Sequence, residues 1–308
     1  MRLDRRSFLA TALAGAGGAM LPRPARSAQA RRSTDPFQLV PLGDTGIEVS
    51  LIGAGTGMHG YNRQSKQTQL GPEKFDALIR HAYDKGVRLF DCADTYGSNP
   101  HVGRALAGLP REDYVLVTKL WVLPGGIPEE ERADAAVTVD RCRQELRTDY
   151  IDVVQIHCMS DPDWREQQAR AMDLLADLKD RGVIRAHGVS IHSLPALDVC
   201  ATTPWVDVVH TRVNPFGDAM DDPDPGVVTP VIRNIHEAGK GVIGMKLIGE
   251  GRYRDDPAKR DEAIRFVLGL GTVDTMIVGF ETTDEIDDFA ARVGAALEES
   301  QEVPPAEE

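Results

Sequence analysis

The sequence predicts an α/β fold, a (β/α)8 TIM barrel that follows a short N-terminal β-hairpin. Short Val-, Ile- and Leu-rich runs alternate with segments of helical period along the chain. These runs are continuous, which is typical of strands buried on both faces of a parallel sheet. The 308 residues leave room for the roughly 250 that one such barrel needs. A doubly wound open sheet is the alternative, but the glycine-rich run 53–57 lacks the spacing of a phosphate-binding fingerprint.

The hairpin is expected within 38–50, where a Gly-Asp-Thr-Gly turn lies between short apolar flanks. Proline and glycine mark the helix ends; Pro72, for example, begins a helix that Gly86 ends. Strands are expected from 51 and at 87–91, 114–119, 151–157, 186–190, 206–211, 242–246 and 273–278. Helices are expected at 72–85, in a short segment that follows the second strand and ends at 107, and at 128–147, 164–181, 195–201, 227–238, 257–270 and 283–297.

The first thirty residues resemble an export signal. Arg5 and Arg6 precede an apolar run from Phe8 to Leu21, and Ala28-Gln29-Ala30 is a candidate cleavage site. The paired arginines are typical of a twin-arginine (Tat) signal, although Asp4 stands where such signals often have Ser or Thr. We therefore expect a signal at 1–30, a linker at 31–36, one barrel domain at 37–298 and an acidic tail at 299–308. This organisation predicts that the protein is exported by the Tat machinery to the periplasm or to another location outside the cytoplasm.

Charge and length exclude several classes of partner. The net charge is −13, and without the +4 of residues 1–30 it becomes −17. An acidic body should repel nucleic acid and anionic membrane surfaces. The apolar run spans only 14 residues, whereas a bilayer needs roughly 20, so no stable membrane span is expected.

The cysteines form no C-x-x-C pair; they are Cys92, Cys142, Cys158 and Cys200. Because a Tat substrate folds before export in a reducing compartment, we expect no structural disulfide.

Polar side chains lie where three neighbouring strands should end. Asp91 ends the second strand with Tyr96 five residues later, Lys119 ends the third, and His157 ends the fourth. Barrel enzymes place their chemistry at this face, so we expect these four residues to be catalytic. Each residue alone is weak evidence, because a strand-end Asp is commonly a turn former and a His is commonly structural.

This set suits the reduction of a carbonyl group, which needs a hydride on carbon and a proton on oxygen. A free phenol has a pKa of about 10, and we expect Lys119 to lower the pKa of Tyr96. Asp91 would keep Lys119 charged, and His157 would hydrogen-bond the substrate oxygen. Trp121 is either a wall of the substrate pocket or a packing residue of the barrel rim.

The chain resembles the aldo-keto reductase family in four stretches in order, from about Phe37 to Arg292. They are Gly86–Tyr96, Val117–Trp121, Asp152–His157 and Gly188–Ser190. The resemblance implies an NADPH-dependent reductase of an aldehyde or ketone, with Tyr96 as the acid. It also implies a set of cofactor-binding residues, namely Gly55, Thr56, Ser190, His210, Met245, Lys246, Leu247 and Gly279.

The sequence departs from the family pattern around the cofactor. Ile191 stands for an Asn, His210 for a Gln, and Met245 for the aromatic residue that stacks on the nicotinamide. The segment that would meet the adenosine 2′-phosphate, 278–285, has no cation, and Glu281 would repel a phosphate. These departures weaken the NADP(H) preference that the resemblance implies and leave NAD(H) possible.

Two other functions remain open. A non-catalytic exported barrel that binds a cofactor or partner would explain the export signal, because free NADPH is not expected outside the cytoplasm. A metal-dependent hydrolase would use His157, His192 and His210, which lie at or just after strand ends, as Zn²⁺ ligands. No H-x-H follows the first strand and no carboxylate ends the eighth, so we expect no metal.

Overall fold

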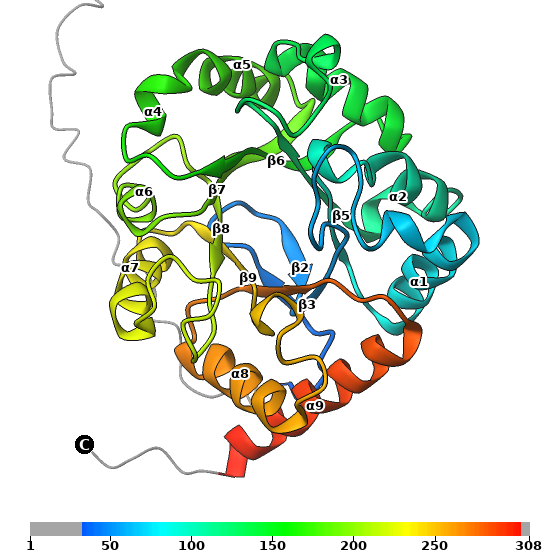
Figure 1. Cartoon of the computed structure of the whole chain (residues 1–308), viewed down its shortest axis with the longest axis vertical. Coiled ribbons are helices and arrows are strands. Elements are labelled where there is room, and N and C mark those ends of the chain that lie inside the picture. The colour runs from blue at the N-terminus through cyan, green and yellow to red at the C-terminus, as the bar shows by residue number, and fades with distance from the viewer. Residues whose placement is uncertain (1–32, 303–308) are drawn as a thin grey trace, which may run out of the picture. The chain divides into compact units, whose positions relative to one another are not determined.

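The computed structural model describes residues 33–302, so the expected export signal lies outside the described residues. Eight parallel strands form a closed barrel in the order β10-β3-β4-β5-β6-β7-β8-β9, and helices surround it (Figure 1). The strands are β3 (Ile52–Gly55), β4 (Leu89–Asp91), β5 (Val115–Leu120), β6 (Ile151–Met159), β7 (Ile184–Ile191), β8 (Val208–Arg212), β9 (Gly241–Met245) and β10 (Thr275–Val278). The predicted (β/α)8 barrel is confirmed.

The predicted hairpin is also present and closes one end of the barrel. Its strands, β1 (Leu39–Pro41) and β2 (Glu48–Ser50), pair antiparallel. Leu42 and Ile47 of the hairpin belong to the same buried cluster as the inward side chains of the barrel strands. A Cβ on Gly43, whose φ is +53°, would lie 2.3 Å from the Gly241 nitrogen, so the turn needs glycine to approach β9.

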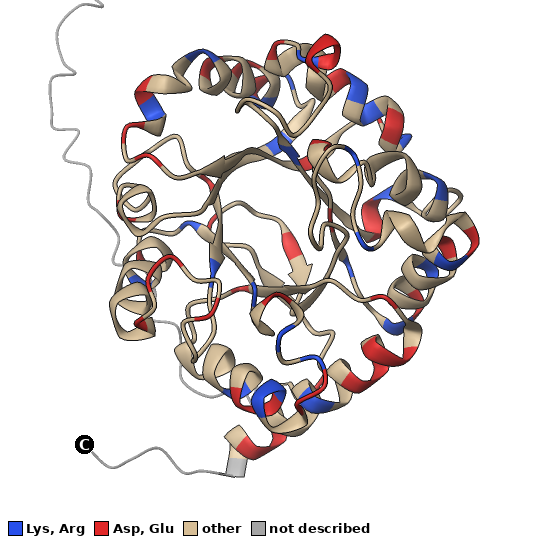
Figure 2. Ribbon diagram, in the orientation of Figure 1, with Lys and Arg blue, Asp and Glu red and all other residues tan. Residues whose placement is uncertain are grey.

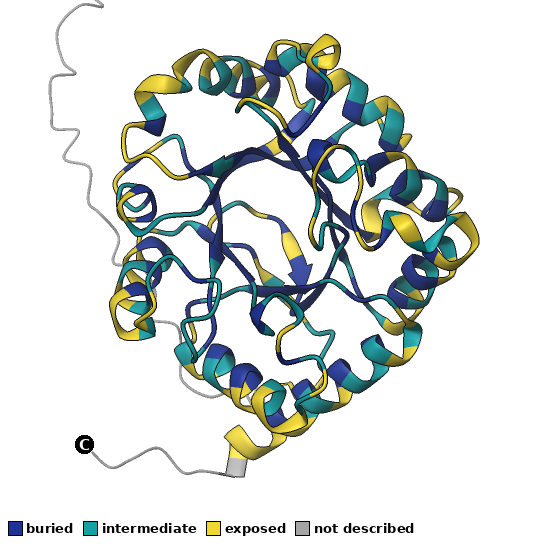
Figure 3. Ribbon diagram, in the orientation of Figure 1, coloured by how far each residue is buried: buried dark blue, intermediate teal, exposed yellow. Residues whose placement is uncertain are grey.

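The helices bury one face against the strands and expose the other. They are α1 (Pro72–Lys85), α2 (Asn99–Ala105), α3 (Ala135–Leu146), α4 (Trp164–Gln167), α5 (Ala169–Asp180), α6 (Leu194–Asp198), α7 (Pro225–Glu237), α8 (Pro257–Leu270) and α9 (Thr283–Glu302). Figure 3 shows buried strands inside a ring of helices with exposed outer surfaces, and Figure 2 shows most charged residues on that ring. This is the arrangement expected when helices cover the outer face of a parallel sheet.

Three helical segments differ from the sequence prediction. Residues 128–134 are not part of α3, because Arg132 donates to the carbonyl groups of Leu123 and Gly125 and so belongs to the preceding loop. The segment 164–181 contains two helices that meet at Gln168. The last helix runs to Glu302, into the segment expected to be an acidic tail.

Side chains alternate between two buried clusters along each strand. One cluster fills the barrel interior and includes Leu89, Val117 and Val208. The other joins the strands to the helices and includes Phe90 and Leu116. Because side chains alternate in direction, the residue two positions after an interior residue also points inward. The apolar interior of the barrel therefore supports the inward side chains that follow at the carboxyl ends of the strands.

Within residues 33–302, no helix combines the length and apolar character that a membrane span requires. All four cysteines are free; three are buried, and Cys158 is partly exposed.

Candidate active site

A polar layer lies above the apolar interior of the barrel. Asp91 follows Leu89 by two residues, and Lys119 follows Val117 in the same way. His210 likewise follows Val208. Alternation therefore points all three polar side chains inward at the carboxyl ends of their strands.

Asp91 and Lys119 form a buried ion pair. Lys119 Nζ contacts Asp91 Oδ1 and donates to the Cys92 carbonyl oxygen at 2.9 Å. Only 1% of the Lys119 side chain and 3% of the Asp91 side chain are exposed. Burial alone would raise the pKa of Asp91, but the ammonium of Lys119 and then the nearby His210 ring lower this pKa to about 2. The Asp91 carboxyl is therefore ionised at neutral pH.

Tyr96 lies beside this pair, although not as the sequence suggested. Lys119 Nζ lies 5.1 Å from the centre of the Tyr96 ring, over its face. Burial and then the negative charge of Asp91 raise the pKa of Tyr96 well above its ordinary value. The expected lowering of this pKa by Lys119 is thus corrected, because Asp91 engages the ammonium and the phenol is desolvated. The phenol is protonated at neutral pH and can donate its proton.

His157 faces the Tyr96 hydroxyl. Its Nε2 lies 3.4 Å from Tyr96 Oη and its Nδ1 lies 3.5 Å from Thr95 Oγ1, both long for hydrogen bonds. Burial and then the charge of Lys119 hold the pKa of His157 well below its usual range. Trp121 packs edge-on against this ring, with centroids 5.3 Å apart. His157 is therefore a neutral hydrogen-bonding group; Trp121 packs against it but lines neither lobe of the cleft described below.

An ion network holds the turn that carries Tyr96. Asp94 is fully buried and accepts two hydrogen bonds from Arg141, at 2.8 and 2.9 Å, while Arg63 lies 3.0 Å from it. The same turn ends at Gly97, whose φ is +65° and where a Cβ would lie 2.2 Å from the Arg63 carbonyl oxygen. The sequence reasoning did not identify this support for Tyr96.

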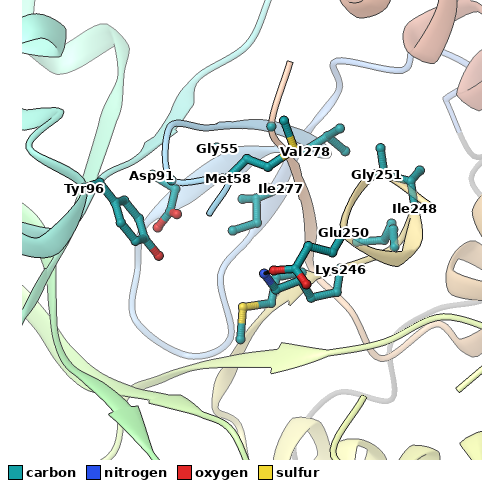
Figure 4. A pocket seen from close by; sticks show the side chains of 14 residues that line it. Gly55, Met58, Asp91, Tyr96, Lys246, Ile248, Glu250, Gly251, Ile277 and Val278 are labelled. Atoms are coloured by element: carbon teal, nitrogen blue, oxygen red, sulfur yellow. Dashed lines mark hydrogen bonds and ion pairs between the residues drawn. The ribbon is translucent and has the colours of Figure 1, made fainter. Parts of the chain in front are cut away.

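A cleft opens between Tyr96 and the loop that follows β9. Its near lobe has about 580 Å³ of empty space, part of which is open to solvent. In Figure 4, Tyr96 and Asp91 lie on one side, Lys246 and Glu250 on the other, and Ile277 between them. The near lobe is lined by Gly55, Gly57, Met58, Asp91, Tyr96, Met245, Lys246, Leu247, Ile248, Glu250, Gly251, Ile277, Val278 and Gly279. The glycines keep this wall free of side chains; a Cβ on Gly57 would lie 2.1 Å from the Tyr96 ring.

Five expected cofactor residues line this lobe: Gly55, Met245, Lys246, Leu247 and Gly279.

The other three, Thr56, Ser190 and His210, do not line the lobe, and each has a different partner. Thr56 is buried and donates to the Asp91 carbonyl oxygen at 2.7 Å. Ser190 accepts from the Cys158 amide at 2.8 Å, and His210 contacts Asp91. Their expected contact with a cofactor stays a prediction; in this structure they contact the surrounding backbone and Asp91. The family pattern indicated the positions of these residues without indicating their partners.

The cleft continues into a far lobe of about 400 Å³, which shares Met58, Ile248, Gly251, Val278 and Gly279 with the near lobe. The far lobe proper is lined by Arg254, Arg260, Phe280, Glu285 and Phe289.

The far lobe contains cations that the sequence reasoning missed. Arg254 donates to Glu281 at 2.6 Å and contacts Glu285. The segment 278–285 indeed has no cation of its own, but the loop after β9 supplies one. Only the tertiary arrangement brings these loops together, so no local sequence signal could have found it.

Among residues 33–302, no group of three or more His, Cys, Asp or Glu side chains is placed to bind a metal ion. His157, His192 and His210 therefore do not form the cluster that a hydrolase metal site would need.

Comparisons with known proteins assign the chain to a family. The model of the aldo/keto reductase family matches residues 52–265. This chain belongs to the aldo/keto reductase family.

Two curated relatives and one solved structure illustrate the similarity. The chain is 31% identical over 196 residues to the aldo-keto reductase YhdN of Bacillus subtilis (strain 168), which covers 60% of this chain and 56% of the relative. It is 32% identical over 218 residues to the NADH-specific methylglyoxal reductase of Escherichia coli (strain K12), which covers 62% of this chain and 65% of the relative. The matches thus span less than two thirds of each relative. A solved structure of an aldo-keto reductase from Pseudomonas aeruginosa superposes with a TM-score of 0.68 at 25% identity, covering 87% of this chain and all of that one.

Proposed function

We propose that this protein reduces an aldehyde or ketone to an alcohol with a reduced nicotinamide dinucleotide as hydride donor. The observation that carries the proposal is the placement of the Tyr96 phenol. It lies at one end of a glycine-walled cleft, beside the neutral His157 and the buried pair of Asp91 and Lys119.

The residues at this end have different roles in proton transfer to the carbonyl oxygen. A nicotinamide would supply the hydride, and Tyr96 gives its hydroxyl proton to the carbonyl oxygen as negative charge develops there. The raised pKa of Tyr96 keeps that proton available at neutral pH. Lys119, 5.1 Å from the ring, stabilises the phenolate that remains, while Asp91 holds the ammonium in place. His157 accepts or donates a hydrogen bond without adding charge and so orients the carbonyl oxygen.

A dinucleotide suits this cleft, because the two lobes share a wall that includes Gly251 and Gly279 and could take the two ends of an elongated ligand. Gly55, Met245 and Leu247 would contact the reactive ring in the near lobe. Phe280 and Phe289 offer apolar surface for the base in the far lobe.

Charge in the far lobe favours NADH over NADPH. The guanidinium of Arg254 is already paired with Glu281 and Glu285, and these carboxylates would repel a 2′-phosphate while accepting a hydrogen bond from a 2′-hydroxyl. The Escherichia coli relative is named NADH-specific, which supports this preference.

The test is direct binding followed by turnover. The full chain is titrated with NADH and NADPH, with the change in nicotinamide fluorescence reporting binding, and is then mixed with aldehydes and ketones, methylglyoxal among them. We expect NADH to bind and to be oxidised only when a carbonyl compound is present. Binding without turnover across the panel would favour the non-catalytic barrel, and binding of neither dinucleotide would reject the proposal.

We further propose that the first thirty residues direct export through the Tat pathway. The paired Arg5 and Arg6, the apolar run and the small-residue site support this localisation. Because a Tat substrate folds first, the protein can cross with its dinucleotide already bound. The measurement is the fraction of protein recovered outside the cytoplasm, which the double change Arg5→Lys, Arg6→Lys should abolish. Unchanged export of that variant would contradict the route.

A further inference from the structure

An ion pair lies on the wall of the near lobe, opposite the proposed proton donor. Lys246 Nζ donates to Glu250 Oε1 at 2.6 Å, and both residues line the near lobe. Figure 4 shows the pair across the cleft from Tyr96 and Asp91. Among the described residues that line this lobe, Lys246 is the one cation. An anionic part of a ligand would therefore meet a cation that Glu250 already compensates.

The loop that carries this pair borders both lobes of the cleft. Ile248 and Gly251 line the near and the far lobe alike, whereas Lys246 and Glu250 line the near lobe only. A dinucleotide with one ring in each lobe would place its diphosphate between the two rings, next to this loop. An ammonium group is a good partner for a phosphate oxygen, so the diphosphate and Glu250 would seek the same side chain.

The backbone at Lys246 is fixed, whereas its side chain has room to change partner. The Lys246 carbonyl oxygen accepts hydrogen bonds from Asn214 Nδ2 at 3.2 Å and from the Gly249 amide at 3.0 Å. The side chains of the pair are only partly buried, with exposures of 24% for Lys246 and 31% for Glu250. Exchange of Glu250 for another anion therefore needs rotation of the lysine side chain and no displacement of its backbone.

Glu250 is ionised at neutral pH. Burial raises its pKa, but the hydrogen bond and charge of Lys246, followed by His59 and Arg252, hold this pKa below its ordinary value. His192 also interacts electrostatically with Glu250. The near lobe thus contains a carboxylate that binds the ammonium an anionic ligand would need.

We propose that Glu250 is an internal competitor of the cofactor: it holds the ammonium of Lys246 that the diphosphate of a dinucleotide would otherwise take, and it thereby limits the affinity of the cleft. This inference rests on the proposed function, from which it takes its ligand. In the free protein Lys246 is paired with Glu250. In the complex Lys246 turns to the diphosphate, and Glu250 is left with Arg252 and His59 as its neighbours.

Calorimetric titration with adenosine diphosphate ribose tests the competition without any reference to turnover, because this probe carries the diphosphate and lacks the nicotinamide. We expect Glu250→Gln to lower its dissociation constant by about two- to fivefold, as suits a partly exposed ion pair. The dissociation constant of NADH should fall by a similar factor. Glu237→Gln removes an equal charge at the end of α7, which precedes β9 and so lies at the opposite end of the barrel. This matched control should leave both constants unchanged.

Variants of Lys246 show whether its ammonium is what the two anions compete for. Lys246→Met should raise the dissociation constant of the probe by about tenfold, because a hydrogen bond between charged groups is lost. Lys246→Arg keeps a cation and should stay within about threefold of the wild type. In the Lys246→Met background, Glu250→Gln should improve binding by a smaller factor than in the wild type, because no ammonium remains to be released.

The sign of the change decides between two roles of Glu250. Weaker binding by Glu250→Gln would show that the carboxylate holds Lys246 toward the ligand, and unchanged binding by this variant or by Lys246→Met would show that the pair has no part in binding. Equal gains in the two backgrounds would indicate charge repulsion without competition; each of these results overturns the inference. A wild-type protein that binds the probe but reduces no carbonyl refutes the proposed function alone, whereas one that binds neither the probe nor NADH overturns both.

Discussion

The two ends of the cleft differ in how far their charged side chains are exposed to solvent. In the proposed catalytic end, which comprises Asp91, Tyr96, Lys119 and His157, the ion pair is almost completely buried, with side-chain exposures of 1% for Lys119 and 3% for Asp91. In the far lobe, 39% of the Arg254 side chain is exposed. Desolvation makes each charge of the first group dependent on its partner, whereas water and salt screen the second. Substitutions should therefore be severe at one end and graded at the other.

The largest effect is expected for Tyr96→Phe. The change removes the hydroxyl proton and leaves the ring that packs against Gly57. Loss of a general acid should lower kcat by about 10²- to 10⁴-fold, while the dissociation constant of NADH stays nearly unchanged. Single-turnover and binding measurements on the same preparation check this. A variant with wild-type kcat would show that another group delivers the proton.

Lys119→Met should lower stability as well as activity. It leaves Asp91 buried without its cation, and breaking a buried pair costs about 3–5 kcal/mol. Urea unfolding at neutral pH measures this loss. Combining Lys119→Met with Asp91→Asn removes the stranded charge, so the double variant should regain much of the stability and none of the activity. A single variant as stable as the wild type would contradict the ion-pair account.

Acid should weaken the protein partly through His192, next to the catalytic end. Burial and then Arg212 and Lys246 lower the pKa of His192 to about 3. In the unfolded chain His192 binds a proton near pH 6.5, whereas in the folded protein it stays neutral at that pH. Stability is therefore lost as the pH falls below about 6.5. Each such proton is worth about 1.4 kcal/mol per pH unit. Between about pH 6 and pH 4, the free energy of unfolding of His192→Gln should therefore fall by about 1.4 kcal/mol per pH unit less than that of the wild type. Parallel unfolding curves for the two proteins would show that His192 contributes nothing.

The smallest effect is expected in the far lobe. The double change Glu281→Gln, Glu285→Gln releases Arg254 from its two carboxylates and removes their repulsion of a 2′-phosphate. Because these groups are partly exposed, we expect only a several-fold gain in affinity for NADPH relative to NADH, which should fade at high salt. Titrations at low and high salt check this. The single change Glu299→Gln, near the end of α9 and away from the cleft, is the control and should leave the ratio unchanged.

Some of the candidate site could be predicted from single residues and their spacing. Asp91, Lys119 and His157 each end a run that is recognisable as a buried strand, and a closed barrel brings such ends to one face. The pKa of Tyr96 could not be predicted in this way, because it depends on whether Lys119 meets the hydroxyl or the ring. Similarly, His210 occupies a position that the family pattern indicates, but the pattern does not indicate its partner.

The amino-acid sequence by itself determined the barrel, the hairpin and the strand ends that carry the polar residues. These features follow from local hydrophobic runs, from proline and glycine at helix ends, and from the alternation of side chains along a strand. The tertiary structure alone decided that His210 meets Asp91 across the barrel and that Arg254 meets Glu281 and Glu285. Such contacts join side chains that are distant in sequence, and their geometry exists only after the barrel has closed and excluded water from its interior.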